Sequence, residues 1–404
     1  MLVFYFFAAI AICLGLLSLR GGLRFATYVR REVTQPISDY APFVSVIAPF
    51  RGIDESFKEN ISALFAQNYP AYEIIFVVDR TDDPAVTVVE DVRQAWQDAW
   101  RPLTRILIAG PAIDCGQKVH NLRTAVANAD QRAEALVFVD TDARPHGNWL
   151  RSLVAPLSDE GLGAATGYRW FIPDKRRVAS QLRSVWNASI ASALGQAGKK
   201  NFCWGGSTAI RRTVFDSLKV AERWRGTVSD DFTLTRILHE AKLPIHFTPH
   251  CLIASFDDCS WRELLEFTNR QLKITRVYAT HLWQAVLLGG LLFVPIFFGG
   301  LMLVIVRALL ALPIRAPVVL LAIIFALGAA KSWIRLRAVN LALANYGARP
   351  NRDMLAHLFL WPLASVLFLN NALVAAGSRR INWRGISYEL KSATEAVIIS
   401  RDAD

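Results

Sequence analysis

Long apolar runs at both ends of the chain constrain its fold more than any other feature. Leu2 to Leu19 contains no charged residue, Leu282 to Val306 is equally apolar, and Pro317 to Trp333 is interrupted only by Lys331. A helix needs about 20 such residues to cross the hydrocarbon core of a bilayer. Residues 43 to 260, which lie between these runs, have the mixed composition of a water-soluble domain. The sequence therefore predicts an integral membrane protein with one large domain outside the bilayer.

Basic residues directly after the first apolar run predict the orientation of this domain. They are Arg20, Arg24, Arg30 and Arg31. Because positive charge is retained on the cytoplasmic side, we expect the large domain in the cytoplasm, at the inner membrane if the source is bacterial. The run has no basic segment before it and no small-residue cleavage site after it, so we expect residues 1–24 to be a transmembrane anchor.

A further apolar run, Leu355 to Ala376, leaves the topology of the C-terminus open. It is interrupted by His357, Pro362, Asn370 and Asn371. If it crossed the membrane, the basic residues after it would lie outside, against the charge rule. We therefore favour a re-entrant or interfacial segment, so that residues 284–377 form transmembrane or re-entrant helices and residues 378–404 form a cytoplasmic tail.

Overall charge and cysteine content argue against a nucleic-acid-binding protein and against a disulfide-linked protein. The net charge is +11, but many arginines flank the apolar runs, which indicates membrane topology and contact with anionic lipids. We do not expect nucleic-acid binding. The five cysteines form no C-x-x-C pair and no disulfide framework, which is typical of reduced thiols in the cytoplasm.

The central segment alternates between strand and helix patterns. Its clearest β-runs are Phe43 to Pro49, Tyr72 to Val78 and Leu136 to Val139. Strands that alternate with helices predict a mostly parallel sheet covered on both faces, and ligands bind such sheets beyond the carboxyl ends of the strands. Since Asp79 and Asp140 directly follow two of these runs, both acids are expected at one site.

Asp140 and Asp142 are candidate ligands for Mg²⁺ or Mn²⁺. Alternate residues after a buried strand can both turn into the cleft and offer hard oxygen ligands. The alternative is that Asp142 caps a helix that begins near Trp149. Asp79 suits hydrogen bonding to a base or ribose, whereas Asp82 and Asp83 are expected to form a turn and a helix start.

For other polar residues, the sequence allows a structural interpretation as well as a functional one. Asp230 and Asp231, at the start of a predicted helix, either complement the helix dipole or include a general base. Lys118 and Asn121 either contact phosphate and ribose or lie on a solvated helix face. His246 and His250 could complete a metal site, but we expect them to be structural.

These motifs resemble, in order along the chain, those of the GT-A glycosyltransferases of family 2, and more narrowly those of the ceramide glucosyltransferase branch, family 21. The likeness runs from Val44 to about Tyr388. The blocks that carry it are Tyr69-Pro70-x-Tyr72-Glu73, Asp82-Asp83-Pro84-Ala85, Lys118-x-x-Asn121-Leu122, Asp140-x-Asp142, Gly167-Tyr168-Arg169-Trp170, Trp204-Gly205-Gly206-Ser207, Ser229-Asp230-Asp231 and Trp383-Arg384-Gly385.

The resemblance implies a Rossmann-like α/β catalytic domain over residues 43–260 and inverting transfer of a hexose, such as glucose, from a UDP-sugar to a membrane lipid. Asp231 would be the catalytic base, with Asp230 beside it, and Asp142 and Asp140 would hold the metal. The donor side would comprise Asp79, Lys118, Asn121, Asp140, Arg270 and Lys273. The acceptor side would comprise Arg169, Trp170, Trp204, Gly205 and Gly206.

One motif departs from the family pattern. An R/Q-x-x-R-W motif would fall at Arg270 to Ile274, where this chain has Lys273 and Ile274 in place of Arg and Trp. Because polymer-making relatives use that Trp to hold the acceptor sugar, a single transfer to a lipid is favoured over elongation. The alternatives are a processive polysaccharide synthase, transfer to polyprenyl phosphate, and a degenerate membrane scaffold. The last would predict loss of the acids, yet all are retained.

Residues 261–283 interleave apolar and basic side chains. Trp261 and Trp283 lie near the two ends of this stretch. The pattern predicts an amphipathic helix at the membrane interface, which would dock the cleft on the bilayer. The alternative is an amphipathic helix that packs in the protein core.

Overall fold

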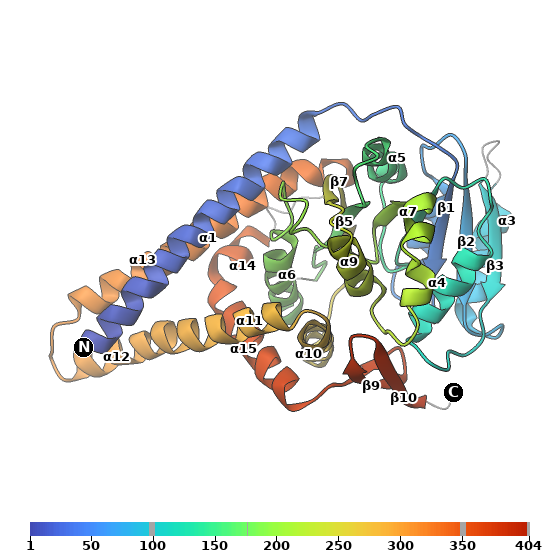
Figure 1. Ribbon diagram of the computed structural model, residues 1–404. Helices are drawn as coiled ribbons and strands as arrows, with labels where there is room; N and C mark the ends of the chain where they lie inside the picture. The colour runs from blue at the N-terminus through green and yellow to red at the C-terminus, as the bar shows by residue number, and fades with distance from the viewer. Residues whose placement is uncertain (97–101, 176, 348–352, 402–404) are drawn as a thin grey trace.

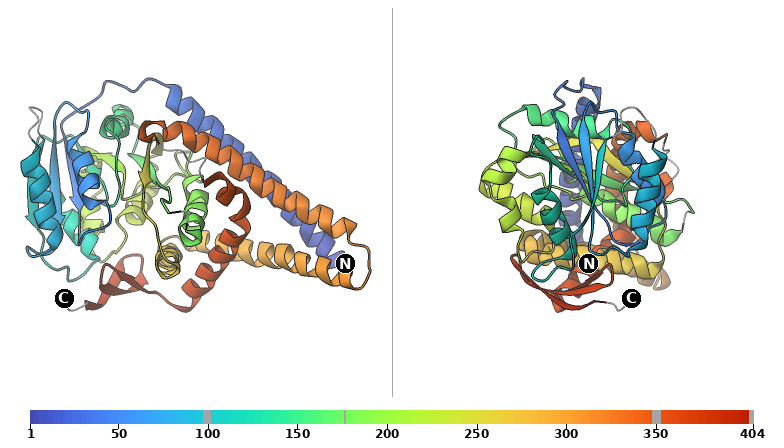
Figure 2. Two further views of the ribbon diagram at one scale, coloured as in Figure 1. Left: turned by 180° about the vertical axis from the view of Figure 1, so that it is seen from behind. Right: turned by 90° about the vertical axis from the view of Figure 1, so that its right-hand side faces the viewer.

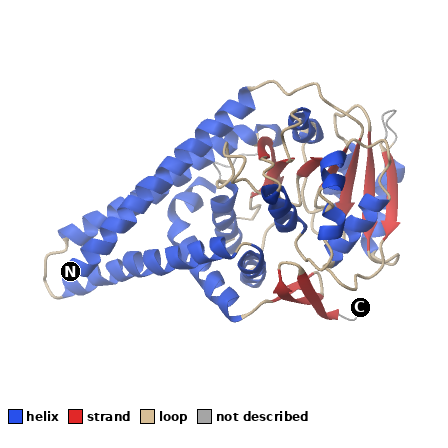
Figure 3. Cartoon of the chain, in the orientation of Figure 1, coloured by secondary structure: helices blue, strands red, loops and turns tan. Residues whose placement is uncertain are grey.

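The computed structural model describes residues 1–96, 102–175, 177–347 and 353–401. An α/β domain forms one end of the molecule, and long helices extend away from it (Figure 1). Figure 3 shows that the strands lie at one end and that the extension is helical. The predicted combination of an α/β domain with long apolar helices is therefore confirmed.

The main sheet has seven strands in the order β3-β2-β1-β4-β6-β5-β7. The strands are β1 (Val44–Pro49), β2 (Tyr72–Val78), β3 (Leu103–Ile108), β4 (Ala135–Phe138), β5 (Ala164–Phe171), β6 (Thr208–Arg211) and β7 (Ile245–Ser255). β1 runs parallel to β2 and β4, and β2 runs parallel to β3. β6 runs antiparallel to both β4 and β5. The mostly parallel sheet is confirmed, whereas the reversed strand β6 has no signature in the sequence.

Helices cover both faces of this sheet (Figure 2, right). The helices of the α/β domain are α2 (Phe57–Phe65), α3 (Pro84–Ala95), α4 (Gln117–Ala127), α5 (Trp149–Val154), α6 (Val178–Ala191), α7 (Arg212–Ser217), α8 (Val220–Arg223) and α9 (Asp230–Glu240). In β2, Ile74 and Phe76 enter the core on one face, and Ile75 and Val77 enter the core on the other. Burial of both faces explains why this strand reads as one continuous apolar run.

Among the described residues, three helices are long and apolar enough to cross a membrane. They are α1 (Leu2–Thr34), the continuous helix Thr280–Leu309, which comprises α11 (Thr280–Val294), η2 (Pro295–Gly299) and α12 (Gly300–Leu309), and α13 (Arg315–Ala342). α1 and α13 lie side by side (Figures 1 and 2). Met1 and the turn between α12 and α13 lie at the end farthest from the α/β domain (Figure 1). The three helices therefore meet the α/β domain at the same end of the bundle.

The run from Leu355 to Ala376 does not carry the chain to the far end. It forms α14 (Met354–Phe359) and α15 (Trp361–Gly377), and α15 packs against α6, α10 and α11. The residues that follow α15 return to the α/β domain, where the Tyr388 hydroxyl accepts a hydrogen bond from the Gln117 amide at 3.1 Å. The chain therefore ends on the side of the α/β domain, as the charge pattern favours.

The amphipathic stretch is divided in the structure. Helix α10 (Trp261–Tyr278) begins with a capping box formed by Ser260 and Glu263, and it ends at Ala279, whose φ of −143° and ψ of 63° are not helical. The predicted helix over 261–283 is therefore too long, because residues from Thr280 onward belong to α11. One face of α10 is buried, and Trp261 at its start is 56% exposed.

The segment expected to be a tail forms a second sheet. Its strands are β8 (Arg380–Trp383), β9 (Ile386–Ser392) and β10 (Glu395–Arg401), all antiparallel. Arg384 and Gly385 form the β8–β9 turn with φ of 52° and 72°, a conformation that suits glycine. Ile386, Tyr388 and Leu390 are buried at alternate positions. This alternation is the sequence signal that predicts a half-buried strand.

Candidate active site

Three charged side chains meet where β4 ends and α4 begins. The Nζ atom of Lys118, in the first turn of α4, lies 2.7 Å from Oδ1 of Asp140 and 3.3 Å from Oδ1 of Asp230. Burial by itself lowers the pKa of Lys118, but Asp140 and Asp230 raise it above its usual range. The ammonium group is therefore held in its charged form. The sequence predicts each of these residues for the site, and the fold brings them together.

Asp142 forms a second ion pair in the same place. Its Oδ1 lies 2.5 Å from the guanidinium of Arg169 on β5, which is also 4.0 Å from Asp140. Burial raises the pKa of Asp142, but Arg169, followed by Arg384, holds this pKa below its usual range. Helix α5 has Asn148 as its N-cap, so Asp142 is not a helix cap. Asp140 and Asp142 thus share one acidic edge with two cations against it.

Asp230 is the most perturbed acid of the site. It is 4% exposed, and burial raises its pKa from 3.8 to about 7. Lys118 opposes this shift, whereas Asp231 and Asp140 add to it. A Cβ on Gly205 would lie 2.4 Å from Oδ2 of Asp230. Only glycine at this position allows the carboxylate to approach the backbone so closely.

The raised pKa predicts how stability depends on pH. Between about pH 3.8 and about pH 7 the folded protein keeps the Asp230 proton that the unfolded chain has lost. The contribution of Asp230 to the free energy of unfolding therefore falls as pH rises through this window and is level above it. We expect Asp230→Asn to raise the melting temperature relative to wild type increasingly across the window, as measured by thermal unfolding. A constant difference would contradict the shift, and Asp216→Asn at an exposed carboxylate is the control.

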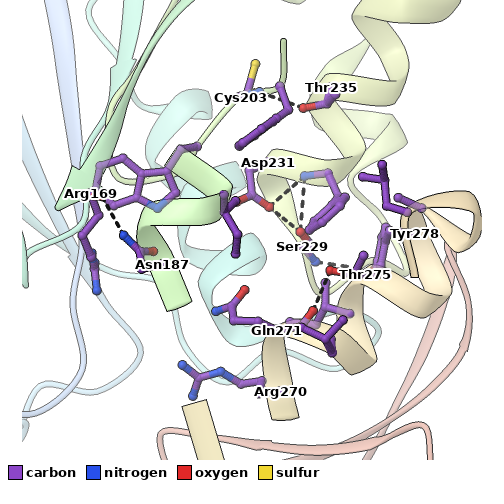
Figure 4. A pocket seen from close by; sticks show the side chains of 18 of the residues that line it. Arg169, Asn187, Cys203, Ser229, Asp231, Thr235, Arg270, Gln271, Thr275 and Tyr278 are labelled. Carbon is purple, nitrogen blue, oxygen red and sulfur yellow. Dashed lines mark hydrogen bonds between the residues drawn. The ribbon is translucent and has the colours of Figure 1, made fainter. Parts of the chain in front are cut away.

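Asp231 projects into the cavity from the first turn of α9 (Figure 4). Its Oδ1 accepts a hydrogen bond from the Phe232 amide at 2.7 Å and another from the hydroxyl of Ser229, the N-cap of the helix. Figure 4 shows Arg169 of β5 and Arg270 of α10 around the same cavity. The carboxylate is thus fixed at a helix N-terminus and open on its other side.

Tyr278, the last residue of α10, holds the segment before these acids. Its hydroxyl accepts a hydrogen bond from the Val228 amide at 2.8 Å, and its ring lies 6.0 Å from the ring of Phe232. Both neighbours flank Ser229 and Asp231. The end of α10 therefore fixes the position of the catalytic candidates, which the sequence does not indicate.

Loss of this hydroxyl should slow the reaction without weakening donor binding. We expect Tyr278→Phe to lower kcat roughly 2- to 10-fold, the rate equivalent of one neutral hydrogen bond, with KM for the donor unchanged. Steady-state kinetics would measure both constants. Tyr40→Phe, at a half-buried tyrosine outside the site, is the control. A change in KM alone would contradict the positioning role.

Asp79, directly after β2, and Asn121, on α4, are two further candidates for the donor side. Oδ2 of Asp79 is 2.6 Å from the guanidinium of Arg51, and its buried Oδ1 has no partner among the described residues. The Asn121 amide accepts a hydrogen bond from Gln117 at 2.9 Å. Asp83 caps α3 and accepts from the Gly52 amide, which supports the predicted turn and helix start.

Trp204 lines the cavity, and the two glycines after it pack closely against Asp230 and the Trp204 ring. The Trp204 ring lies 5.3 Å from the Arg169 guanidinium and 5.6 Å from the Tyr168 ring. A Cβ on Gly206 would lie 2.3 Å from the Trp204 ring. The small residues after Trp204 are therefore required by close packing around the ion pairs.

Trp170 does not line the cavity. It is 2% exposed, and its ring stacks on His357 with centroids 5.6 Å apart. Consecutive residues of a strand point to opposite faces, so the strand that turns Arg169 into the cavity turns Trp170 into the core. We correct its assignment to the acceptor side on this ground.

Arg270 and Lys273, both expected on the donor side, make different contacts. Arg270 lines the cavity, stacks 5.4 Å from the Trp383 ring, and has its pKa lowered to about 10 by burial and by Arg384. Lys273 instead donates a hydrogen bond from Nζ to the Arg380 carbonyl at 2.7 Å. Lys273 does not line the cavity, so only Arg270 stays a donor-side candidate, and Lys273 is corrected to a contact with the C-terminal sheet.

The acidic edge fits a divalent cation that arrives with phosphate. Among the described residues no group of three His, Cys, Asp or Glu side chains could hold a metal by itself. Asp140 and Asp142 have side chains that are 23% and 36% exposed. Mg²⁺ is held by one or two carboxylates plus phosphate oxygens and waters. His246 lies 3.6 Å from Glu32 of α1, away from the acidic edge.

The charged groups Lys118, Asp140, Asp142, Arg169, Asp230, Asp231 and Arg270 line one large cavity together with Asn121 and Trp204, whereas Asp79 lies outside its lining. The cavity continues between the apolar helices. Its volume is about 1630 Å³. The sequence predicts no site role for several of its residues: Arg51, Ser18, Lys331, Trp383, Arg384 and Tyr388. Of these, Trp383 and Arg384 belong to a motif that carries the family resemblance. Arg51 follows β1 as Asp79 follows β2, which is the signal that could have identified it. The membrane-helix and C-terminal residues join the wall only through tertiary contacts.

The sequence is similar to two ceramide glucosyltransferases of Caenorhabditis elegans. Ceramide glucosyltransferase 3 is 30% identical over 88 residues, or 22% of this chain and 18% of that protein. Ceramide glucosyltransferase 1 is 23% identical over 205 residues, or 49% of this chain and 42% of that protein. The alignments thus span less than half the length of these relatives.

Solved structures with similar chain folds are more distant in sequence. A mannosyltransferase from Pyrobaculum calidifontis, in complex with GDP-Man and Mn²⁺, is 19% identical with a TM-score of 0.47 and covers 92% of this chain and 98% of its own. Glucosyl-3-phosphoglycerate synthase from Mycobacterium tuberculosis, in complex with Mn²⁺ and uridine-diphosphate-glucose, is 14% identical with a TM-score of 0.35 and covers 57% of this chain and 77% of its own.

A family model covers nearly the whole chain. The model of glycosyl transferase family 21 matches residues 3–396, from α1 to the C-terminal sheet. The match includes the acidic edge, the cavity and all three long apolar helices. The protein is therefore a glycosyltransferase, and the chain belongs to glycosyl transferase family 21.

Proposed function

We propose that the protein transfers a hexose, such as glucose, from a UDP-sugar to a hydroxyl of a membrane lipid, with inversion at the anomeric carbon. One observation carries this proposal: a single cavity contains Asp231 and the acidic edge and also faces of α11 and α15. Its volume of about 1630 Å³ exceeds the roughly 300–1,000 Å³ of an ordinary small-molecule site. The excess suits a second, lipid substrate beside the nucleotide.

On the donor side, free hydrogen-bonding capacity supports a nucleotide. The unpartnered Oδ1 of Asp79 would accept from the uracil or ribose, and Arg51 would hold that carboxylate in place. Asp140 and Asp142 would hold Mg²⁺ or Mn²⁺, which would supply positive charge to the diphosphate. Lys118 and Arg270 would bind the same leaving group, where fixed cations offset the negative charge that develops on it.

On the acceptor side, Asp231 would act as the general base. The acceptor oxygen forms a bond to the anomeric carbon as the bond from that carbon to the diphosphate oxygen breaks. The hydroxyl proton passes to the Asp231 carboxylate, whose other contacts, Ser229 and the Phe232 amide, hold it in position. Arg169 and Trp204 would contact the entering headgroup, since both line the cavity next to Asp142.

Charge distribution along the three long helices supports a cytoplasmic α/β domain. Arg20, Arg24, Arg30 and Arg31 lie on the half of α1 nearer to the α/β domain. The turn at the far end is flanked by Arg307 and Arg315 alone. The excess of basic residues near the α/β domain is what the positive-inside rule expects on the cytoplasmic side.

Product analysis tests this function directly. Membranes that contain the protein would receive labelled UDP-sugars with Mg²⁺ or Mn²⁺, followed by organic extraction and mass spectrometry. We expect label in a discrete lipid, and roughly 10²- to 10⁴-fold less of it with Asp231→Asn. A product released by mild acid would indicate a polyprenyl phosphate acceptor, and label only in polymer would indicate a polysaccharide synthase. Absence of transfer from every donor would refute the proposal.

A further inference from the structure

One face of α11 forms an apolar groove inside the cavity. Besides the polar His281 near the start of the helix, the residues of α11 that line the cavity are Leu282, Ala285, Val286, Gly289, Gly290 and Phe293. Spacings of three and four residues place them on one side of the helix. From Leu282 to Phe293 the helix rises about 16 Å. The groove thus runs along the membrane helix from the region next to α10 toward the middle of the bundle.

A further part of the cavity is formed by α6 and α15, which contribute apolar side chains together with the polar Asn187, Ser189 and Ser365. Trp186 and Ile190 of α6 and Phe368 of α15 line it, and the rings of Trp186 and Phe368 stack with centroids 4.8 Å apart. A neighbouring side chain already occupies the space beside Gly290, because a Cβ there would lie 2.9 Å from Leu369. Gly289 differs, since nothing lies within 4 Å of the position of its Cβ. The groove therefore has open space beside Gly289.

Aromatic rings surround the inner end of the groove. The Phe293 ring lies 5.4 Å from the Phe297 ring and 5.2 Å from the Trp361 ring. Phe325 of α13 packs against the same Trp361 at 6.0 Å. Phe293, which lines the cavity, thus has three further rings packed behind it, and these four side chains from three helices are defined here as the aromatic wall at the end of the groove.

Polar groups of α1 and α13 also line the cavity. The Nζ atom of Lys331 on α13 donates to the Ser18 hydroxyl of α1 at 2.7 Å, and both residues line the cavity. Ser18 precedes Arg20, where the apolar run of α1 ends. This level therefore corresponds to the boundary between lipid headgroups and hydrocarbon. An occupant that reaches the groove from here can keep its remaining apolar part in the bilayer.

From these observations we infer that the α11 groove binds one hydrocarbon chain of the acceptor lipid and that the aromatic wall limits the length of that chain. The inference rests on the proposed function, because the occupant is the lipid whose hydroxyl meets Asp231. A hydrocarbon chain matches the apolar lining and the continuity of the groove with the catalytic acids. Chain length would be selected because methylenes beyond the aromatic wall find no room.

Two substitutions change the groove in opposite ways. Gly289→Leu places a side chain in the open space, and we expect transfer to the longest-chain acceptors to fall roughly 10-fold or more, the scale on which a pocket rejects methylenes that do not fit. Phe293→Ala removes one ring of the aromatic wall and should shift the product toward longer chains. Gly21→Leu, at another helical glycine with nothing within 4 Å, is the matched control.

The measurement is the chain-length distribution of the glycolipid, determined by mass spectrometry after reaction in native membranes. UDP-induced thermal stabilisation reports whether each variant keeps its donor site. Unchanged distributions for both Gly289→Leu and Phe293→Ala, with the donor site intact, would overturn the inference while leaving the proposed function in place. A change of oligomeric state in Gly289→Leu would overturn it in favour of a second copy of the chain as occupant. Absence of glycolipid from the wild type would instead refute the proposed function.

Discussion

Asp231→Asn is expected to lower turnover roughly 10²- to 10⁴-fold, the usual contribution of a general base, while the protein still binds UDP. Asparagine keeps the shape of the side chain and can still accept the hydrogen bond from the Phe232 amide. It has no basic oxygen to take the proton of the acceptor hydroxyl. The helix start should therefore stay intact while the proton transfer is lost.

Turnover would be measured as labelled glycolipid formed per unit of protein, and nucleotide binding as the shift in melting temperature with UDP. Asp216→Asn, on the exposed surface of α7, controls for the loss of one carboxylate. If Asp231→Asn retained a tenth or more of wild-type turnover, Asp231 would not be the base. Asp230 would then be the next candidate, because its pKa of about 7 also suits proton transfer.

Lys118→Met is expected to destabilise the protein by about 3–5 kcal/mol, the usual cost of removing one partner from a buried ion pair. Lys118 contacts Asp140 at 2.7 Å and Asp230 at 3.3 Å, and Asp230 is almost completely buried. Without the ammonium group, Asp230 loses its cation, and Asp140 keeps the Arg169 guanidinium at 4.0 Å. Sugar transfer from the donor should be lost as well, since Lys118 would bind the diphosphate.

A divalent cation should partly restore this stability. Mg²⁺ or Mn²⁺ can bind between the carboxylates once the ammonium group is absent, so we expect it to raise the melting temperature of Lys118→Met more than that of wild type. Thermal unfolding with and without the metal measures the effect. Lys58→Met, at an exposed lysine of α2, is the control. Equal metal responses in both proteins would contradict cation binding between Asp140 and Asp230 in place of the ammonium group.

The fold class could be predicted from local sequence patterns, because each pattern reflects how its own residues are buried. The runs that end at Asp79 and Asp140 are buried on both faces, as expected for central parallel strands. Since the carboxyl ends of parallel strands meet at one edge, these acids could be assigned to one site before any contact was known. The apolar runs likewise indicated helices long enough to cross a membrane.

Assignments within the site were less accessible, because a motif does not say which way each side chain points. Arg169 and Trp170 are neighbours in one motif, but strand geometry turns only Arg169 into the cavity. Arg270 and Lys273 lie in one helical motif, and only Arg270 remains in the cavity. Residue parity along β5 would have separated the first pair.

Local sequence patterns predict the α/β domain, the long apolar helices and the acids at the strand ends, because these follow from the burial and charge of consecutive residues. Three other features become visible only in the folded chain: the C-terminal strands form part of the cavity wall, Tyr278 holds the segment before Asp231, and α11 contributes a groove. Each of these depends on contacts between segments far apart in the chain. Such contacts are set by the packing of whole elements against one another, which no local pattern of residues encodes.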